Sequence, residues 1–222
     1  MLGWAAMKAP GLFCVLLGCV VVMQSACEKT PAPKTQSNNA VGSGSGSLPD
    51  DTDREQTRYD QDRRPDLIVA AAGIKSGDTV ADVGAGSGLL TLHLARAVGT
   101  GKVVATDIDR AVLDLLVARL RKAGVPDVVE TRIVSADTPG LEDGTYNVIL
   151  LAEVDHYFTD RVAWLTAAQK ALAPGGRIVI SNRVHHRVGA MDAAKKAGLV
   201  RTSEITPVPS HFVAVFTAGK SL

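Results

Sequence analysis

Short apolar runs that alternate with helical patterns constrain this chain more than any other feature. Several of the runs are apolar nearly throughout, which is typical of strands covered on both faces. The alternation predicts an α/β fold built on a doubly wound, mostly parallel sheet. The runs are Thr79–Val83, Lys102–Thr106, Val128–Val134, Tyr146–Leu151 and Arg177–Ser181.

Two of the segments between these runs have helical spacing with recognisable ends. Val112–Leu120 places its apolar residues on one face, and Asp109 is the expected N-cap. A second helix carries apolar residues between Val162 and Leu172, with Thr159 as the expected cap and Pro174–Gly176 as the stop. Both helices fit the layers of a doubly wound fold.

The two ends of the folded region depart from the alternation. Asp51–Ala72 predicts one or two short helices, interrupted near Pro65. At the other end, a helix near Gly189–Ala197 precedes two strands, about Val200–Thr206 and Phe212–Thr217. The short gap between these strands fits a hairpin and excludes a crossover connection. The sequence thus predicts a seven-stranded sheet with a C-terminal antiparallel hairpin.

A glycine loop follows the first of the strands. Val80–Gly88 reads VADVGAGSG, a strand that runs into closely spaced glycines and then into a helix. Such glycines permit sharp turns and close approach of a ligand to the backbone. The spacing is G-x-G-x-G, which differs from the dinucleotide fingerprint G-x-G-x-x-G. Asp82 lies beside the loop, where it would repel a pyrophosphate and attract a cationic group such as an α-ammonium.

Acidic residues end four successive strands. Asp107 closes the second strand and can accept both hydroxyls of a ribose. Asp137 and Glu153 follow the next two strands. Ligands of open α/β sheets bind at the carboxyl ends of the strands, so these acids are expected to share one site with Asp82.

Three further segments accompany the glycine loop: VVATDID, AD and a late strand that reads PGG-R-IVIS. With these motifs the chain resembles the class I S-adenosylmethionine-dependent methyltransferases, from about residue 65 to the end. The resemblance implies a Rossmann-like fold, S-adenosylmethionine as cofactor and methyl transfer as activity. It also implies a role for each motif residue. The methionyl end would be held by Asp82, Gly84, Gly86 and Gly88, the ribose by Asp107, the adenine by Ile108 and Asp137, and the reacting centre would be faced by Glu153.

Simpler interpretations remain for several of these residues. An Asp after a strand is commonly a turn former or a helix cap, which applies most to Asp137, and Glu153 could be a solvated strand end. His156 follows the fourth strand and is the candidate general base, but a structural or solvated histidine is an equal alternative. Arg183–Arg187 reads RVHHR and is favoured as an exposed loop over an anion site. Its adjacent histidines would face opposite sides of a regular strand, so no metal site is predicted.

Residues 1–27 are typical of an export leader, with a short apolar run and two lipobox-like cysteines. Cys27 is favoured as the lipidated residue, because polar residues follow it at once. Cys19 matches the lipobox letters better but would leave VVVM on the mature end. An uncleaved N-terminal anchor is the alternative. Residues 28–50 are rich in Pro, Ser and Gly and predict a flexible linker to a domain at 51–222.

Composition narrows the function further. The formal net charge is +1 and aromatic residues make up 4%, so a nucleic-acid partner is not expected. All three cysteines lie in the leader, which leaves the domain without a thiol metal site. The sequence predicts methyl transfer to an unknown acceptor, expected to be a small molecule, by a protein anchored on the periplasmic side of a bacterial envelope. A non-catalytic module that binds the same cofactor is the alternative, since an exported domain has to meet a cytoplasmic cofactor. A dinucleotide oxidoreductase is disfavoured.

Overall fold

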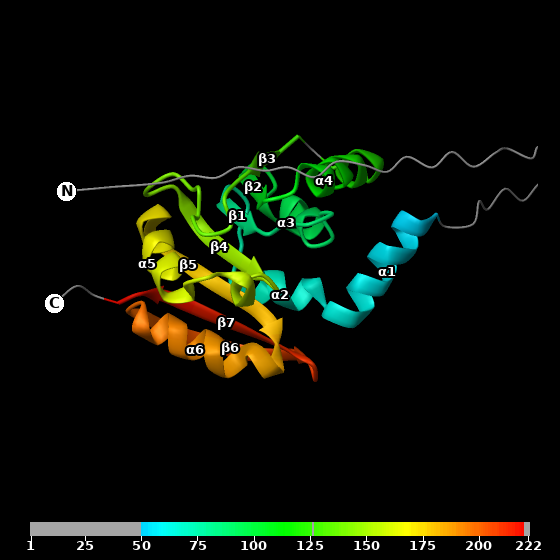
Figure 1. The fold of residues 1–222 in the computed structure, drawn as a ribbon. Coiled ribbons are helices and arrows are strands. Elements are labelled where there is room, and N and C mark those ends of the chain that lie inside the picture. Colours follow the sequence, from blue (N-terminus) through cyan, green and yellow to red (C-terminus); the bar gives the residue numbers. More distant parts are fainter. Residues whose placement is uncertain (1–49, 126, 220–222) are drawn as a thin grey trace, which may run out of the picture. The chain divides into compact units, whose positions relative to one another are not determined.

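The computed structural model describes residues 50–125 and 127–219. Its centre is a seven-stranded sheet of order β3-β2-β1-β4-β5-β7-β6 (Figure 1). β7 runs antiparallel to β5 and to β6, and the pairs among the first five strands are parallel. The predicted fold class and the C-terminal hairpin are therefore confirmed. The strands are β1 (Thr79–Val83), β2 (Lys102–Asp107), β3 (Val129–Ile133), β4 (Tyr146–Ala152), β5 (Leu172–Arg183), β6 (Leu199–Val208) and β7 (His211–Ala218).

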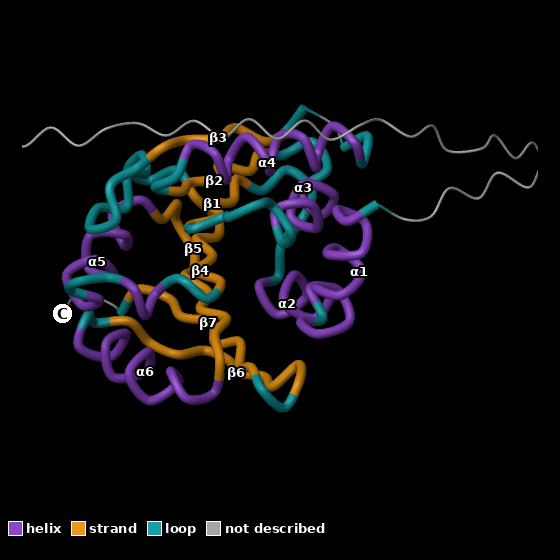
Figure 2. The backbone as a smooth tube through the Cα atoms, turned by 45° about the vertical axis from the view of Figure 1, so that its right-hand side comes forward, coloured by secondary structure: helices purple, strands orange, loops and turns teal. Residues whose placement is uncertain are grey.

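Helices cover both faces of the sheet. Figure 2 shows α1, α2 and α3 on one side and α5 and α6 on the other. The helices are α1 (Asp51–Arg63), α2 (Pro65–Ala72), α3 (Thr91–Val98), α4 (Arg110–Lys122), α5 (Arg161–Ala168) and α6 (Arg187–Lys196), with 3-10 turns η1 (Asp155–Tyr157), η2 (Gln169–Ala171) and η3 (Val184–His186). Among the helices of the described residues, none has both the length and the apolar character needed to cross a bilayer.

The period of two along β4 divides its side chains between two of the three clusters of the core. In β4, Val148 and Leu150 pack with α2 and α3, whereas Ile149 and Leu151 pack with Trp164 and the other apolar residues of α5. All four of these strand side chains are fully buried. Burial on both faces explains why the central strands are apolar nearly throughout rather than alternating with polar residues.

Local signals set most of the helix ends. Asp109 caps α4, its carboxylate accepting from the backbone N–H of Ala111 at 2.8 Å, as predicted. Pro65 starts α2 and separates it from α1, because Arg64 before it takes a left-handed conformation with φ 50°. The predicted cap Thr159 is wrong by one residue. Asp160 caps α5 instead, accepting from Ala163 N at 2.9 Å.

Pro174–Gly176 was expected to stop the helix before it, and this prediction is wrong. α5 stops earlier, at Ala168, and β5 already begins at Leu172. The register between β4 and β5 shifts between Tyr146 and Val148, so the proline and the glycines occupy an irregular start of the strand. Such irregularities accommodate residues that a regular ladder excludes.

Candidate functional site

The glycine loop between β1 and α3 owes its shape to left-handed glycines. At Gly84, with φ 67°, an added Cβ would lie 2.5 Å from Cγ2 of Val154. At Gly88, with φ 84°, it would lie 2.7 Å from Cγ of Leu116. Gly86 has φ 56° and nothing within 4 Å of the same position. Two glycines are thus required for packing, and the third leaves open space above the loop.

Asp107 joins the end of β2 to the loop. Its Oδ2 accepts from Gly86 N at 2.9 Å, and its Oδ1 accepts from Ile108 N at 2.8 Å and from Asp109 N at 3.1 Å. These backbone contacts fix the carboxylate in place. Because a carboxylate has about four acceptor positions, one of them remains for a ligand hydroxyl.

Asp82 is buried at the end of β1, with only 1% of its surface exposed. Its Oδ2 accepts from the Thr91 hydroxyl at 2.7 Å. Burial raises the pKa of Asp82 to about 6, even though the Thr91 hydrogen bond lowers it. Among the described residues no cation pairs with this carboxylate, so a bound cation would relieve its unfavourable burial.

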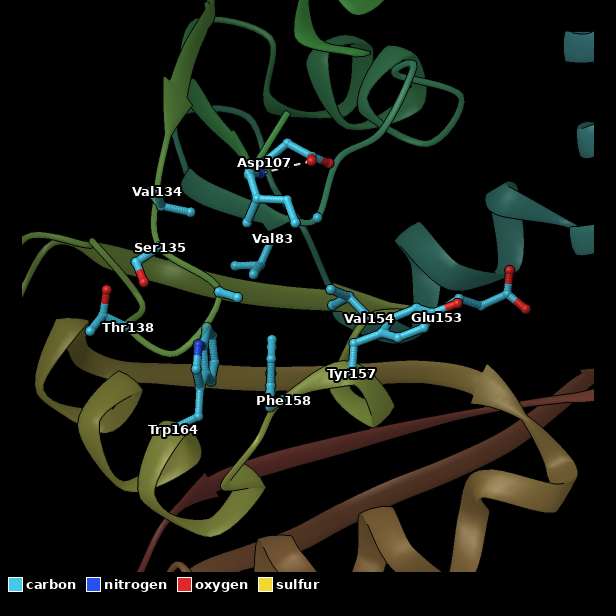
Figure 3. A pocket seen from close by; sticks show the side chains of 13 residues that line it. Val83, Asp107, Val134, Ser135, Thr138, Glu153, Val154, Tyr157, Phe158 and Trp164 are labelled. Atoms are coloured by element: carbon cyan, nitrogen blue, oxygen red, sulfur yellow. Dashed lines mark hydrogen bonds between the residues drawn. The ribbon is translucent and has the colours of Figure 1, made fainter. Parts of the chain in front are cut away.

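A cavity of about 400 Å³ opens at the carboxyl ends of β1 to β4 and is called the cofactor cavity below. Four of the predicted residues line it: Gly84, Asp107, Ile108 and Glu153. Asp82, Gly86 and Gly88 lie in the strand and loop beside it. The remaining lining residues are Val83, Val134, Ser135, Ala136, Thr138, Val154, Tyr157, Phe158 and Trp164, most of which Figure 3 labels.

Asp137 is not among the lining residues, although its neighbours Ala136 and Thr138 are. Its side chain is exposed, and Oδ1 accepts from the backbone N–H of Thr159 at 3.3 Å. The carboxylate thus ties the segment after β3 to the segment before α5. Its predicted contact with an adenine amino group stays a prediction.

Aromatic side chains close one side of the cavity. Phe158 stacks on Trp164 with ring centroids 4.4 Å apart and an interplanar angle of 12° (Figure 3). Trp164 is 2% exposed, so it belongs to the core, and it also lines the cavity. No sequence motif marks these residues, and the signal that could have found them is the aromatic pair Tyr157-Phe158 a few residues after the predicted fourth strand.

Glu153 has a backbone conformation that is uncommon for its residue type, with φ 55°. Its carboxylate pairs with the buried Arg63 of α1. It also accepts from Nε2 of His211 at 3.0 Å and from Nε of Arg183 at 3.1 Å. Burial raises the pKa of Glu153, but Arg63 and the two other donors outweigh it and hold the pKa at about 2. The carboxylate is therefore ionised and already engaged.

His156 lies in η1, on a small buried network. Its Nδ1 is 2.9 Å from Nδ2 of Asn182, and the same Nδ2 donates to Oδ1 of Asp155 at 2.6 Å. Asp155 and Asn182 are both fully buried. The ring of His156 stacks on that of His186, with centroids 4.1 Å apart and an interplanar angle of 12°.

A second cavity, of about 380 Å³, lies next to the first and is called the histidine pocket below. The segment after β5 is exposed at Arg183, Val184 and His185, as predicted, but it forms the 3-10 turn η3 instead of an irregular loop and lines this pocket. The turn brings His185 and His186 together, with centroids 4.0 Å apart, whereas a regular strand would separate them. The lining residues are Glu153, His156, Tyr157, Arg183, His185 and His186. Within the described residues there is no group of three or more side chains that could hold a metal ion.

The donors and acceptors of the cofactor cavity fit S-adenosylmethionine. Asp82 is a buried carboxylate without a cation, and the α-ammonium of the methionyl group is a cation. Asp107 is fixed at the end of β2 with one acceptor position left for a ribose hydroxyl. Ile108 is 63% exposed although it is apolar, and it lines the cavity, where an adenine ring would cover it.

The sequence matches a known family over its central part. A family model described as "Methyltransferase domain" matches residues 81–178. The ubiquinone/menaquinone biosynthesis C-methyltransferase UbiE of Escherichia coli is 34% identical over 115 residues, which are 51% of this chain and 46% of that protein. The chain thus spans about half the length of the curated relatives it matches.

Solved structures agree with this match at the level of the fold. A SAM-dependent methyltransferase from Aquifex aeolicus has a TM-score of 0.66 at 20% identity, covering 73% of this chain and 96% of that one. A putative methyltransferase of Haloferax volcanii, in complex with the Trm112 activator, has a TM-score of 0.63 at 15% identity, with 76% and 94% covered. Residues 81–178 thus match the methyltransferase domain model, and the described residues share their fold with these two solved structures.

Proposed function

We propose that this protein transfers a methyl group from S-adenosylmethionine to a small-molecule acceptor. The observation that carries the proposal is the placement of Asp82 and Asp107 around the glycine loop. One carboxylate is buried without a cation, and the other is held by backbone N–H groups at the wall of the cofactor cavity. The match to a methyltransferase domain and the relatives' activity support the same reaction.

Each end of the cofactor has a proposed partner. The methionyl end is held by Asp82 with the backbone of Gly84, Gly86 and Gly88. A ribose hydroxyl donates to Asp107, and the adenine packs on Ile108, with its amino group directed to Asp137. Glu153 lines both this cavity and the histidine pocket. It therefore lies at the boundary across which the methyl group would pass from the cofactor to the acceptor.

When bound, S-adenosylmethionine would supply a methyl group on a positively charged sulfur. The acceptor atom would bond to the methyl carbon as the carbon–sulfur bond breaks, and the leaving group would be S-adenosylhomocysteine. Because the donor is already activated, the protein mainly has to bind, orient and desolvate the two reactants. The stacked pair Phe158 and Trp164 keeps one wall of the cavity apolar. A base is required only for an acceptor that loses a proton, and that role of His156 stays a prediction.

Calorimetry on the full-length chain in detergent tests the proposal. We expect S-adenosylhomocysteine to bind and a nicotinamide dinucleotide to give no heat, because Asp82 repels a pyrophosphate. Binding of the dinucleotide without S-adenosylhomocysteine would overturn the proposal. Transfer of a labelled methyl group to a panel of small acceptors then separates an enzyme from a module that only binds the cofactor.

We further propose that a lipid on Cys27 holds the domain at the periplasmic side of a bacterial envelope. Residues 1–49 lie outside the described residues, so the support is the sequence alone, a short apolar run followed by a polar, Pro-containing linker. Intact-mass measurement of the membrane fraction tests this. Cys27→Ser should abolish the added lipid mass and Cys19→Ser should preserve it. A mature protein that starts at Cys19, or an unprocessed Met1, would contradict the choice.

A further inference from the structure

The histidine pocket and the cofactor cavity share part of their walls. Glu153 and Tyr157 line both. Tyr157 is 75% exposed, so its ring offers a free aromatic surface at the boundary. A molecule in the histidine pocket would therefore lie next to the methyl group of a cofactor bound as proposed above, and the inference below depends on that proposal.

Positive charge predominates around the histidine pocket. Its one lining carboxylate, Glu153, is already engaged by Arg63, His211 and Arg183. Arg183 donates to this carboxylate through Nε alone, and its two Nη atoms have no partner among the described residues. Its side chain is 61% exposed. The guanidinium thus keeps donors and charge available for an anion.

Asp155, the next carboxylate on the chain, does not offset this charge. It is fully buried, and its Oδ2 lies 3.3 Å from Nε of Arg161. On the opposite side, Arg187 is paired with Glu204 of β6. The excess charge facing the pocket therefore comes from Arg183, with Arg63 behind Glu153.

The hydrogen bonds of Asn182 determine which nitrogen of His156 carries the proton. Oδ1 of Asn182 accepts from the backbone N–H of Arg183 at 2.7 Å, which identifies the amide oxygen. Its Nδ2 therefore points to Asp155 and to Nδ1 of His156, donating to both. Because Nδ1 accepts, the proton of the neutral ring resides on Nε2. His156 then offers a hydrogen-bond donor to the pocket, rather than the lone pair that a base would use.

We propose that the histidine pocket is the methyl-acceptor site and that it takes a small acceptor with an anionic oxygen group, held by the guanidinium of Arg183 and by Nε2–H of His156. His185 and His186 also line this pocket, with His186 stacked on His156, and Tyr157 lines both this pocket and the cofactor cavity. Asn182 is a positioning residue, since it acts on the acceptor only through the tautomer of His156.

Calorimetry with the full-length chain, saturated with S-adenosylhomocysteine, tests the site. Benzoate and phenyl phosphate serve as anionic probes, and benzamide is the neutral isostere of benzoate. We expect at least one anion to bind about 10-fold more tightly than benzamide. Arg183→Gln should remove about 10-fold of that affinity, as for a hydrogen bond to a charged group. The matched control is Arg201→Gln, which removes an arginine that lines a different cavity, and it should leave the affinity unchanged.

Nitrogen-15 spectra of the histidine side chains give an independent readout. In its neutral form the His156 ring should show a protonated Nε2 and an unprotonated Nδ1, and benzoate should shift the Nε2 signal. A ring protonated at Nδ1 would overturn the donor role.

The outcomes separate the two proposals. Failure of S-adenosylhomocysteine to bind would overturn the proposed function. Binding of S-adenosylhomocysteine together with equal affinities for benzoate, phenyl phosphate and benzamide would overturn only the acceptor site. An Arg183→Gln variant that keeps both S-adenosylhomocysteine and anion affinity would do the same.

Discussion

The cofactor cavity and the histidine pocket form two halves of one cleft, called the cofactor half and the proposed acceptor half below. The two halves are built from contacts between residues at very different separations in the sequence. In the cofactor half, Asp107 binds the backbone of Ile108 and Asp109, one and two residues away, and of Gly86, 21 residues away. In the acceptor half, Glu153, which also lines the cofactor cavity, pairs with Arg63, 90 residues away, and with His211, 58 residues away. One half is a compact motif of strand ends and loop, and the other is assembled from distant elements.

This difference shows which changes each half should tolerate. The cofactor half depends on backbone conformation, so substitutions that alter the loop should damage it most. The acceptor half depends on side-chain pairs, where a variant can remove one partner and leave the backbone unchanged. The predictions below test this contrast, from the largest expected effect to the smallest.

Gly88→Val should destabilise the protein by about 3–5 kcal/mol. The new side chain would meet Leu116 at 2.7 Å, and its backbone would have to keep φ 84°. Chemical denaturation measures the effect. The matched control is Gly86→Val, which meets nothing within 4 Å and should cost only about 1–2 kcal/mol for its left-handed φ, while it blocks S-adenosylhomocysteine. Equal losses for the two variants would contradict the packing role of Gly88.

Arg63→Met should cost about 3 kcal/mol, because it leaves the partly buried Glu153 without its main cation. Denaturation of the single variants and of the double variant with Glu153→Gln gives the coupling between the two residues. We expect the double variant to be more stable than Arg63→Met alone. Additive losses would show that the pair does not hold the acceptor half together.

Asp107→Ala should weaken S-adenosylhomocysteine binding by about 1.5–3 kcal/mol, since it removes a charged acceptor from the ribose. Asp107→Asn keeps the shape and should lose less. Calorimetry reports both affinities, and the unfolding curves of the variants check that the loop remains folded. Wild-type affinity in a folded Asp107→Ala protein would refute the ribose assignment.

Asp82→Asn should stabilise the empty protein by about 1–3 kcal/mol at pH 7 while it weakens cofactor binding. The folded pKa of about 6 lies above the ordinary value of 3.8, so the folded state binds the proton more tightly than the unfolded state. Wild-type stability from this group should therefore fall as the pH rises from about 4 to about 6, and the variant should lack that fall. Thermal unfolding across this range measures it, and identical pH profiles would argue against a buried carboxylate.

Local patterns explain the parts of the fold that the sequence predicted well. β1 begins and ends where expected, Asp109 caps α4, and the C-terminal hairpin follows from a gap too short for a crossover. The wrong cap at Thr159 has an equally local cause, since Asp160 next to it is as good a cap and only the chain geometry chooses between them.

The acceptor half had no such pattern. His185 and His186 are adjacent in sequence, and only the 3-10 turn η3 makes them line one pocket. Asn182 carries no motif, yet its buried amide sets the tautomer of His156 across 26 residues. Arg63 lies in a very polar helix with nothing to mark it as a buried residue.

The sequence by itself determined the fold class, the glycine loop and the strand-end acids, because each rests on a short-range rule of backbone conformation or strand burial. The tertiary structure alone decided which of those acids are free for a ligand. Among the described residues it leaves Asp82 buried without a cation and directs three donors at Glu153, although both acids lie at strand ends. The physical reason is that solvation and ion pairing depend on neighbours in space, and α1, β5 and β7 reach the carboxylate of Glu153 only after the chain has folded.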